Sequence, residues 1–142
     1  MTQKLKQVLI LCTGNSCRSQ MAEGLINHYL SGGWKAYSAG VLPSAVHPLA
    51  IKVMAEIGID ISGHHSKSVN EFLLRNDFDL VVTVCGNAKE SCPVFPANVK
   101  NVHVGFDDPA EWSDKPEAIA LAKFREVRDN IRTRLLPFIE NY

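Results

Sequence analysis

This sequence has no net charge, no long hydrophobic run and no low-complexity segment. Its 15 Lys and Arg residues balance 15 Asp and Glu residues, and the pI is near 7. Balanced charge gives no indication of a nucleic-acid partner. No apolar stretch is long enough for a transmembrane helix, and the apolar run after residues 1–6 is too short for a signal peptide. We therefore expect a cytoplasmic protein with no membrane partner, and a monomer as the simplest state.

Cysteine is also scarce, with four residues in 142. The spacings Cys12…Cys17 and Cys85…Cys92 match no zinc motif, and the five histidines are scattered, so we expect no metal site and no tightly bound cofactor. At 46% hydrophobic, a chain of this length can bury a core without disulfides. The cysteines are therefore better explained as functional thiols in a reducing compartment.

Apolar segments alternate with helical patterns along the chain. The predicted strands are residues 8–11, 34–39, 78–84 and 99–104. The predicted helices are 19–30, one from 47–48, a short one behind a capping box at 68–71, a short one over 86–92, and a long last one from 116. This alternation predicts an α/β fold with a four-stranded parallel sheet and helices on both faces. We expect one domain over residues 1–142.

Chemically reactive side chains follow three of these strands. Cys12 ends the first, Cys85 ends the third, and Asp107 and Asp108 follow the fourth. Ligands of open parallel sheets bind beyond the carboxyl ends of the strands. We therefore expect these groups to face one crevice.

The segment 12–19, Cys-Thr-Gly-Asn-Ser-Cys-Arg-Ser, joins a buried strand to a helix. Backbone N–H groups at a helix start bind anions, and the helix dipole there favours a thiolate at Cys12. Arg18 can offer a planar fork to two oxygens of a tetrahedral oxyanion, and Ser19 can donate to the Cys12 sulfur. The alternative is a buried cysteine in an ordinary turn. The predicted anion-binding residues are Thr13, Gly14, Asn15, Ser16, Cys17, Arg18 and Ser19.

The other chemically suggestive residues leave alternatives open. On one helix, Cys85 and Cys92 would have Cα atoms ~10.5 Å apart, too far for a disulfide unless that helix unwinds, so a bond there would act as a switch. Two unrelated buried thiols are the alternative.

Asp108, before Pro109, is a candidate general acid. Asp107 is the other candidate, and the sequence does not choose between them. Cys17 is better explained as a packing or pocket-lining residue.

The segment 12–23 resembles the phosphate-binding loop of thioredoxin-coupled arsenate reductases, which share the low-molecular-weight protein tyrosine phosphatase fold. Further matches lie at residues 37–40, 58–62, 81–86, 92–93 and 105–110, so the resemblance spans nearly the whole chain. The loop alone fits either branch of this fold, and the Cys85/Cys92 pair indicates the reductase.

The resemblance implies a relay of three thiols. Cys12 attacks arsenate held by the loop and Arg18, and Asp108 protonates the departing oxygen. Cys85 attacks the Cys12–arsenic adduct and arsenite leaves, and then Cys92 attacks Cys85. Thioredoxin reduces the final disulfide, and phosphate or sulfate competes for the loop. Weak phosphatase side activity is expected because the loop chemistry is shared.

The sequence departs from the family pattern at one position. Some members bind potassium through residues equivalent to Asn15, Glu23 and Ser38 and through an acidic residue where this chain has Lys67. An ammonium there could replace the cation, so we expect weak or no potassium dependence. Two other functions stay open: a low-molecular-weight tyrosine phosphatase, which would leave Cys85 and Cys92 unused, and a non-catalytic oxyanion or redox sensor.

Overall fold

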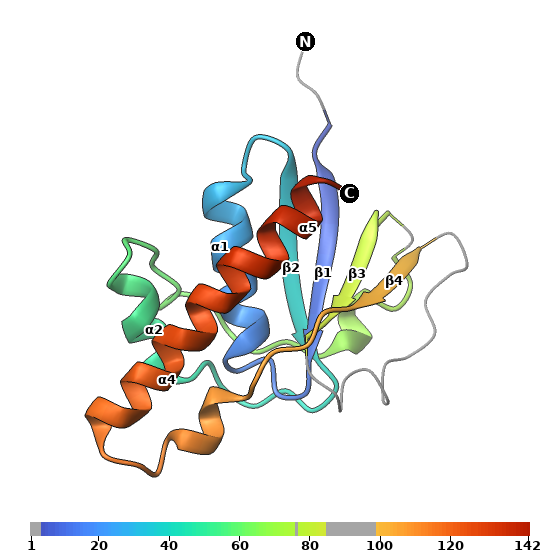
Figure 1. The fold of residues 1–142 in the computed structure, drawn as a ribbon. Coiled ribbons are helices and arrows are strands. Elements are labelled where there is room, and N and C mark those ends of the chain that lie inside the picture. Colours follow the sequence, from blue (N-terminus) through green and yellow to red (C-terminus); the bar gives the residue numbers. More distant parts are fainter. Residues whose placement is uncertain (1–3, 76, 85–98) are drawn as a thin grey trace.

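The computed structural model describes residues 4–75, 77–84 and 99–142. Within them, four strands form one parallel sheet in the order β2-β1-β3-β4 (Figure 1). The strands are β1 (Lys6–Cys12), β2 (Trp34–Gly40), β3 (Leu80–Thr83) and β4 (Lys100–His103). The predicted parallel sheet is therefore confirmed, with a third strand shorter than expected.

The apolar residues of the central strand β1 do not alternate with polar ones, because both faces of the strand are buried. Val8 and Ile10 pack into one hydrophobic cluster, and Leu9 and Leu11 pack into a second cluster on the opposite face. All four side chains are fully buried. A strand covered on both faces needs apolar residues at every position.

The larger cluster lies under the main helices of the protein. These are α1 (Arg18–Tyr29), α2 (Pro48–Ala55), α4 (Glu117–Asn130) and α5 (Leu136–Glu140), and Figure 1 shows α1, α4 and α5 on one side of the sheet. The opposite face is covered, in the described part of the chain, by the short 3₁₀ helix η1 (Val69–Phe72). A second 3₁₀ helix, η2 (Pro109–Trp112), lies in a segment predicted to be a loop.

The last helix is not continuous as predicted. Between α4 and α5 the chain forms a π-helical turn, η3 (Ile131–Leu135). Pro137 follows two residues after this turn, and proline has no N–H for the carbonyl four residues before it. A wider turn at that point is a common response of a helix to such an interruption.

The residues that begin and end the helices were predicted with mixed success. His47 caps α2 by accepting from the Leu49 amide, and Ser68 and Glu71 form the predicted capping box. The capping box begins a 3₁₀ turn instead of an α-helix. Helix α2 ends before Gly58, which occupies the following turn with a φ of 80°.

Some predictions fall on residues that the structure does not describe. Cys85, Cys92 and the short helix expected between them lie outside the described residues. Among the helices that are described, none is both long and apolar enough to cross a membrane.

Candidate active site

The candidate site is built on the connection from β1 to α1. Cys12 is the last residue of β1, Cys17 is the N-cap of α1, and Arg18 is its first residue. The loop between them therefore lies at the positive end of the α1 dipole, where backbone N–H groups have no partners within the helix. This placement agrees with the predicted anion-binding loop.

A buried hydrogen-bond chain surrounds the Cys12 sulfur. Ser19 Oγ lies 2.8 Å from Cys12 Sγ, and Asn15 Nδ2 donates to Ser19 Oγ at 2.8 Å. Because the Ser19 oxygen already accepts from Asn15, its proton is available to the sulfur. A hydroxyl that donates to sulfur stabilises the thiolate over the thiol.

Asn15 holds the loop in a conformation that few side chains adopt. Its φ is +50°, and its side chain is fully buried. Its Oδ1 accepts from Gln20 Nε2 at 3.0 Å and from the Lys67 amide at 2.8 Å. These bonds compensate the strain of the left-handed backbone.

The carbonyls of the loop are bound by the segment 41–47. The amides of Leu42, Ser44 and His47 donate to the carbonyls of Thr13, Gly14 and Ser16, at 2.8, 3.0 and 3.1 Å. Across a trans peptide the N–H points opposite to the C=O. The N–H groups of residues 14, 15 and 17 therefore point away from that segment.

Gly40, at the end of β2, allows the loop to approach the sheet. A Cβ at this position would lie 2.6 Å from Thr13 O and 2.8 Å from Asn15 N. Both contacts are to backbone, which has little freedom to move.

The loop opens into a cavity of about 300 Å³. It is lined by Cys12, Thr13, Gly14, Ser16, Cys17, Arg18, Ser44, Asp108 and Ala110. Asn15 and Ser19, both predicted to bind the anion, are not among the lining residues and instead support the loop from behind. The sequence analysis did not predict Ser44 and Ala110 as site residues, because they join the site only through their position in the folded protein.

The structure places the two candidate acids differently. Asp108 lines the cavity, and its Oδ2 lies 3.5 Å from Arg18 Nη2. Asp107 Oδ2 instead binds Lys123 Nζ at 2.9 Å, and its side chain is 78% exposed. The hydrogen bond from Lys123 holds the pKa of Asp107 below its usual range. Of the two, Asp108 has the position of an acid that can reach a bound oxyanion.

Cys17 differs from Cys12 in its environment. Burial raises the pKa of the Cys17 thiol to about 12, with only a weak contact from its sulfur to Ser16 Oγ at 3.8 Å. A thiol with so high a pKa is a poor nucleophile near neutral pH. Its position supports the predicted role as a pocket-lining residue.

Lys67 lies beside Glu23, beneath the loop. Lys67 Nζ is 3.8 Å from Glu23 Oε1 and donates to the His65 carbonyl at 3.2 Å. Ser38 Oγ donates to the same carboxylate oxygen at 2.7 Å, and His64 Nδ1 lies 3.3 Å from the other oxygen. A cation already faces this carboxylate, so these residues fit a potassium ion poorly. Within the described residues, no cluster of three metal-ligating side chains occurs.

Comparison with known proteins agrees with this geometry. The family model "Low molecular weight phosphotyrosine protein phosphatase" matches residues 7–141. The arsenate reductase of Bacillus subtilis (strain 168) is 50% identical over 135 residues, covering 95% of this chain and 96% of that protein.

Solved structures give the same result. An arsenate reductase in its oxidized state superposes with a TM-score of 0.80 at 33% identity, covering 96% of this chain and 98% of the other. The thioredoxin-dependent arsenate reductase of Corynebacterium glutamicum has a TM-score of 0.69 at 26% identity, covering all of this chain and 66% of the other. This chain therefore belongs to the low molecular weight phosphotyrosine protein phosphatase family, and it is similar over nearly its whole length to arsenate reductases.

Proposed function

We propose that this protein reduces arsenate to arsenite through Cys12, Cys85 and Cys92 and is regenerated by thioredoxin. The observation that carries the proposal is the cavity in which Cys12, Arg18 and Asp108 meet at the start of α1. Similarity to arsenate reductases over nearly the whole chain supports arsenate as the oxyanion. The biological role would be arsenic detoxification.

In the first step, the residues of the cavity act on arsenate. The Cys12 thiolate attacks arsenic, an S–As bond forms, and an As–O bond breaks. Arg18 and the loop amides hold the remaining oxygens, and Asp108 gives its proton to the oxygen that leaves as water. The preorganised N–H groups and guanidinium stabilise charge on the oxyanion as the step proceeds.

The electron transfer follows through Cys85 and Cys92, which lie outside the described residues. Cys85 attacks Cys12 Sγ, and the S–As bond breaks with its electron pair on arsenic, so As(V) becomes As(III) and a Cys12–Cys85 disulfide forms. Cys92 then attacks Cys85 and releases the Cys12 thiolate. Thioredoxin reduces the Cys85–Cys92 disulfide and is itself oxidised. These three steps rest on the sequence resemblance.

The remaining assignments follow from the same proposal. Residues 1–142 form one arsenate reductase domain that acts in the cytoplasm as a monomer, with thioredoxin as its protein partner. Phosphate and sulfate compete with arsenate for the loop. Potassium is not required, because the Lys67 ammonium already lies beside the Glu23 carboxylate.

A coupled assay tests the proposal. The protein is incubated with arsenate, thioredoxin, thioredoxin reductase and NADPH, and NADPH oxidation is followed. We expect turnover that is abolished in Cys12→Ser, Cys85→Ser and Cys92→Ser. Turnover that survives Cys92→Ser would contradict thioredoxin coupling and indicate a small-thiol reductant.

Phosphatase activity is the second candidate, because the cavity suits any tetrahedral oxyanion and the family is named for phosphatases. We expect it only as a weak side reaction. Hydrolysis of p-nitrophenyl phosphate that exceeds arsenate turnover, and that is unchanged in Cys85→Ser and Cys92→Ser, would make it the main function. A sensor without catalysis would show turnover in neither assay.

A further inference from the structure

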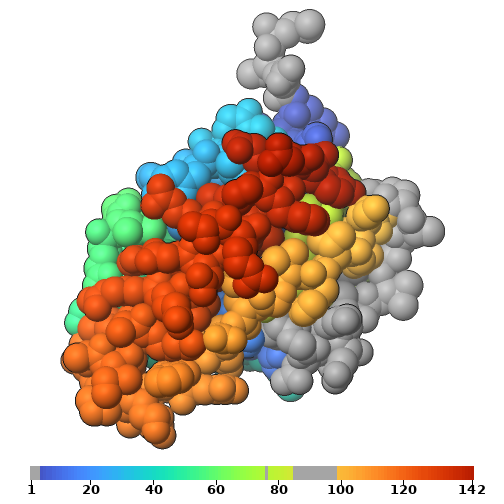
Figure 2. All heavy atoms as spheres, viewed as in Figure 1, coloured from blue at the N-terminus to red at the C-terminus, as the bar shows by residue number. Residues whose placement is uncertain are grey.

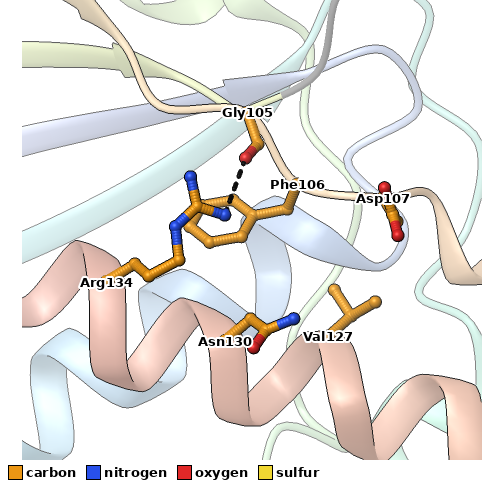
Figure 3. Close-up of a pocket in the computed structure, with 6 residues that line it drawn as sticks. All are labelled: Gly105, Phe106, Asp107, Val127, Asn130 and Arg134. Atoms are coloured by element: carbon orange, nitrogen blue, oxygen red, sulfur yellow. Dashed lines mark hydrogen bonds between the residues drawn. The ribbon is translucent and has the colours of Figure 1, made fainter.

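The segment that carries Asp108 is bound from one side by helix α4 and the π turn that follows it. In Figure 2 the chain from β4 through η2 runs alongside the C-terminal helices across the front of the molecule, with η2 against α4. Between them lies a pocket of about 280 Å³ (Figure 3), lined by Gly105, Phe106, Asp107, Val127, Asn130 and Arg134. Figure 3 shows the Arg134 side chain reaching across this pocket to the segment.

Arg134 binds the segment before Asp108 in two ways. Its Nη1 donates to the Gly105 carbonyl at 3.3 Å, and its guanidinium carbon lies 4.7 Å from the centre of the Phe106 ring. The Phe106 side chain is only 9% exposed, although Arg134 itself is on the surface. A guanidinium that stacks on a ring and also donates to the adjacent carbonyl restricts both translation and rotation of the segment.

Lys123 binds the segment on the other side of Phe106. Its Nζ donates to Asp107 Oδ2 at 2.9 Å and lies 5.3 Å from the centre of the Trp112 ring. The Lys123 side chain is 14% exposed. Two cations therefore contact the segment immediately before Asp108: Arg134 at the Gly105 carbonyl and the Phe106 ring, and Lys123 at the Asp107 carboxylate.

This segment contacts the active site through Arg18. Arg18 Nη1 donates to the Phe106 carbonyl at 3.2 Å, and Arg18 Nη2 lies 3.5 Å from Asp108 Oδ2. The Phe106 carbonyl and the Asp108 carboxyl therefore contact the same guanidinium, which lines the cavity.

We propose that Lys123 and Arg134 are positioning residues that hold the Asp108 carboxyl in the cavity with Cys12. The inference rests on the proposed role of Asp108 as the general acid. Arg134 is on the surface and the Asp107 carboxylate that binds Lys123 is 78% exposed, and contacts screened by solvent contribute little to folding stability, so removing these cations should affect catalysis more than stability. Misplacing a catalytic group by about 1 Å can cost ~100-fold in rate.

The test compares Arg134→Leu and Lys123→Met with Arg132→Leu in the arsenate assay. Arg132 is the matched control, because it lies on the same π turn, is exposed, and stacks on Tyr29 at 4.4 Å. Melting temperatures are measured for all variants. If Arg134→Leu does not fold, Arg134→Lys replaces it in the test, because lysine keeps the charge and loses the planar stack on Phe106.

We expect kcat to fall about tenfold in Arg134→Leu and Lys123→Met, with KM for arsenate within about twofold, because proton transfer occurs only in the transition state. Arg132→Leu should keep both constants while losing similar thermal stability. Lys123→Arg should recover most of the lost kcat. A rise in KM with unchanged kcat, or equal losses in Arg132→Leu, would overturn the proposal.

A double-mutant cycle with Asp108→Asn tests whether Arg134 affects kcat through Asp108. If Arg134 acts through Asp108, Arg134→Leu should lower kcat by less than about twofold in the Asp108→Asn background. A full tenfold loss in that background would show that Arg134 acts elsewhere. Failure of the proposed function is distinguishable, because the wild-type protein would then show no arsenate turnover.

Discussion

Ser19 Oγ lies 2.8 Å from Cys12 Sγ, inside the core of the protein and at the first turn of α1. The hydroxyl is itself oriented by Asn15 Nδ2. The contact joins the reactive sulfur to the helix that supplies the anion-binding backbone. It is therefore the most direct link between the fold and the nucleophile.

Replacing Ser19 by alanine should slow attack by Cys12. The variant removes one hydrogen bond to a sulfur anion, worth about 1.5–3 kcal/mol, so we expect kcat for arsenate to fall roughly tenfold or more. The rate of Cys12 alkylation by iodoacetamide should fall in parallel. The exposed Ser62→Ala serves as the control. Unchanged alkylation in Ser19→Ala would show that the hydroxyl does not stabilise the thiolate.

Cys17 should resist alkylation while Cys12 reacts. Alkylation requires the thiolate, and burial raises the pKa of Cys17 to about 12, so its thiol stays protonated up to strongly alkaline pH. We expect peptide mass spectrometry after brief iodoacetamide treatment at about pH 8 to find label on Cys12 and not on Cys17. Equal labelling of the two residues would contradict this assignment.

Asp108 and Asp107 should differ in their contribution to turnover. Asp108→Asn keeps the shape of the side chain and removes the acid, so kcat should fall by about 100-fold or more. Asp107→Asn keeps an oxygen that can accept from Lys123, so its fall in kcat should be much smaller than that of Asp108→Asn. Steady-state kinetics of the two variants decide the matter, and a larger loss in Asp107→Asn would reverse the assignment.

Potassium should not stimulate the wild-type enzyme. Lys67 Nζ lies 3.8 Å from Glu23 Oε1, so a cation is already part of the chain at this position. We expect the same activity and melting temperature in KCl and in NaCl of equal ionic strength. Lys67→Asp removes that cation and should create potassium-dependent stabilisation. Marked activation of the wild-type protein by millimolar potassium would refute the idea.

Gly40→Ala should damage the oxyanion loop. The new Cβ would lie 2.6 Å from Thr13 O, and overpacking against backbone costs about 1–3 kcal/mol. We expect a lower melting temperature and a smaller rise of that temperature on adding phosphate. Gly33→Ala is the matched control, since its Cβ would meet nothing within 4 Å. Similar behaviour of the two variants would contradict the close approach.

Much of the fold could be predicted from local sequence patterns. The uninterrupted apolar run of β1 indicated a strand buried on both faces, and the capping box at Ser68 and Glu71 correctly began a helical turn. The π turn before Pro137 and the 3₁₀ helix η2 were missed, because both depend on how a short segment packs. Their local sequence is also compatible with an α-helix and a loop.

The chemistry of the loop follows from its local sequence. A cysteine and an arginine between a buried strand and a helix start carry a nucleophile, a cation and oriented N–H groups in one short segment. The residues alone left Asp107 and Asp108 open and the resemblance implied Asp108, whereas the tertiary structure shows Asp108 beside Arg18 and Asp107 beside Lys123. Folding also brings Lys67 beside Glu23 and Gly40 against Thr13. The reason is physical: the loop is formed by neighbours along the chain, whereas these contacts join residues that become neighbours only when the sheet and helices pack.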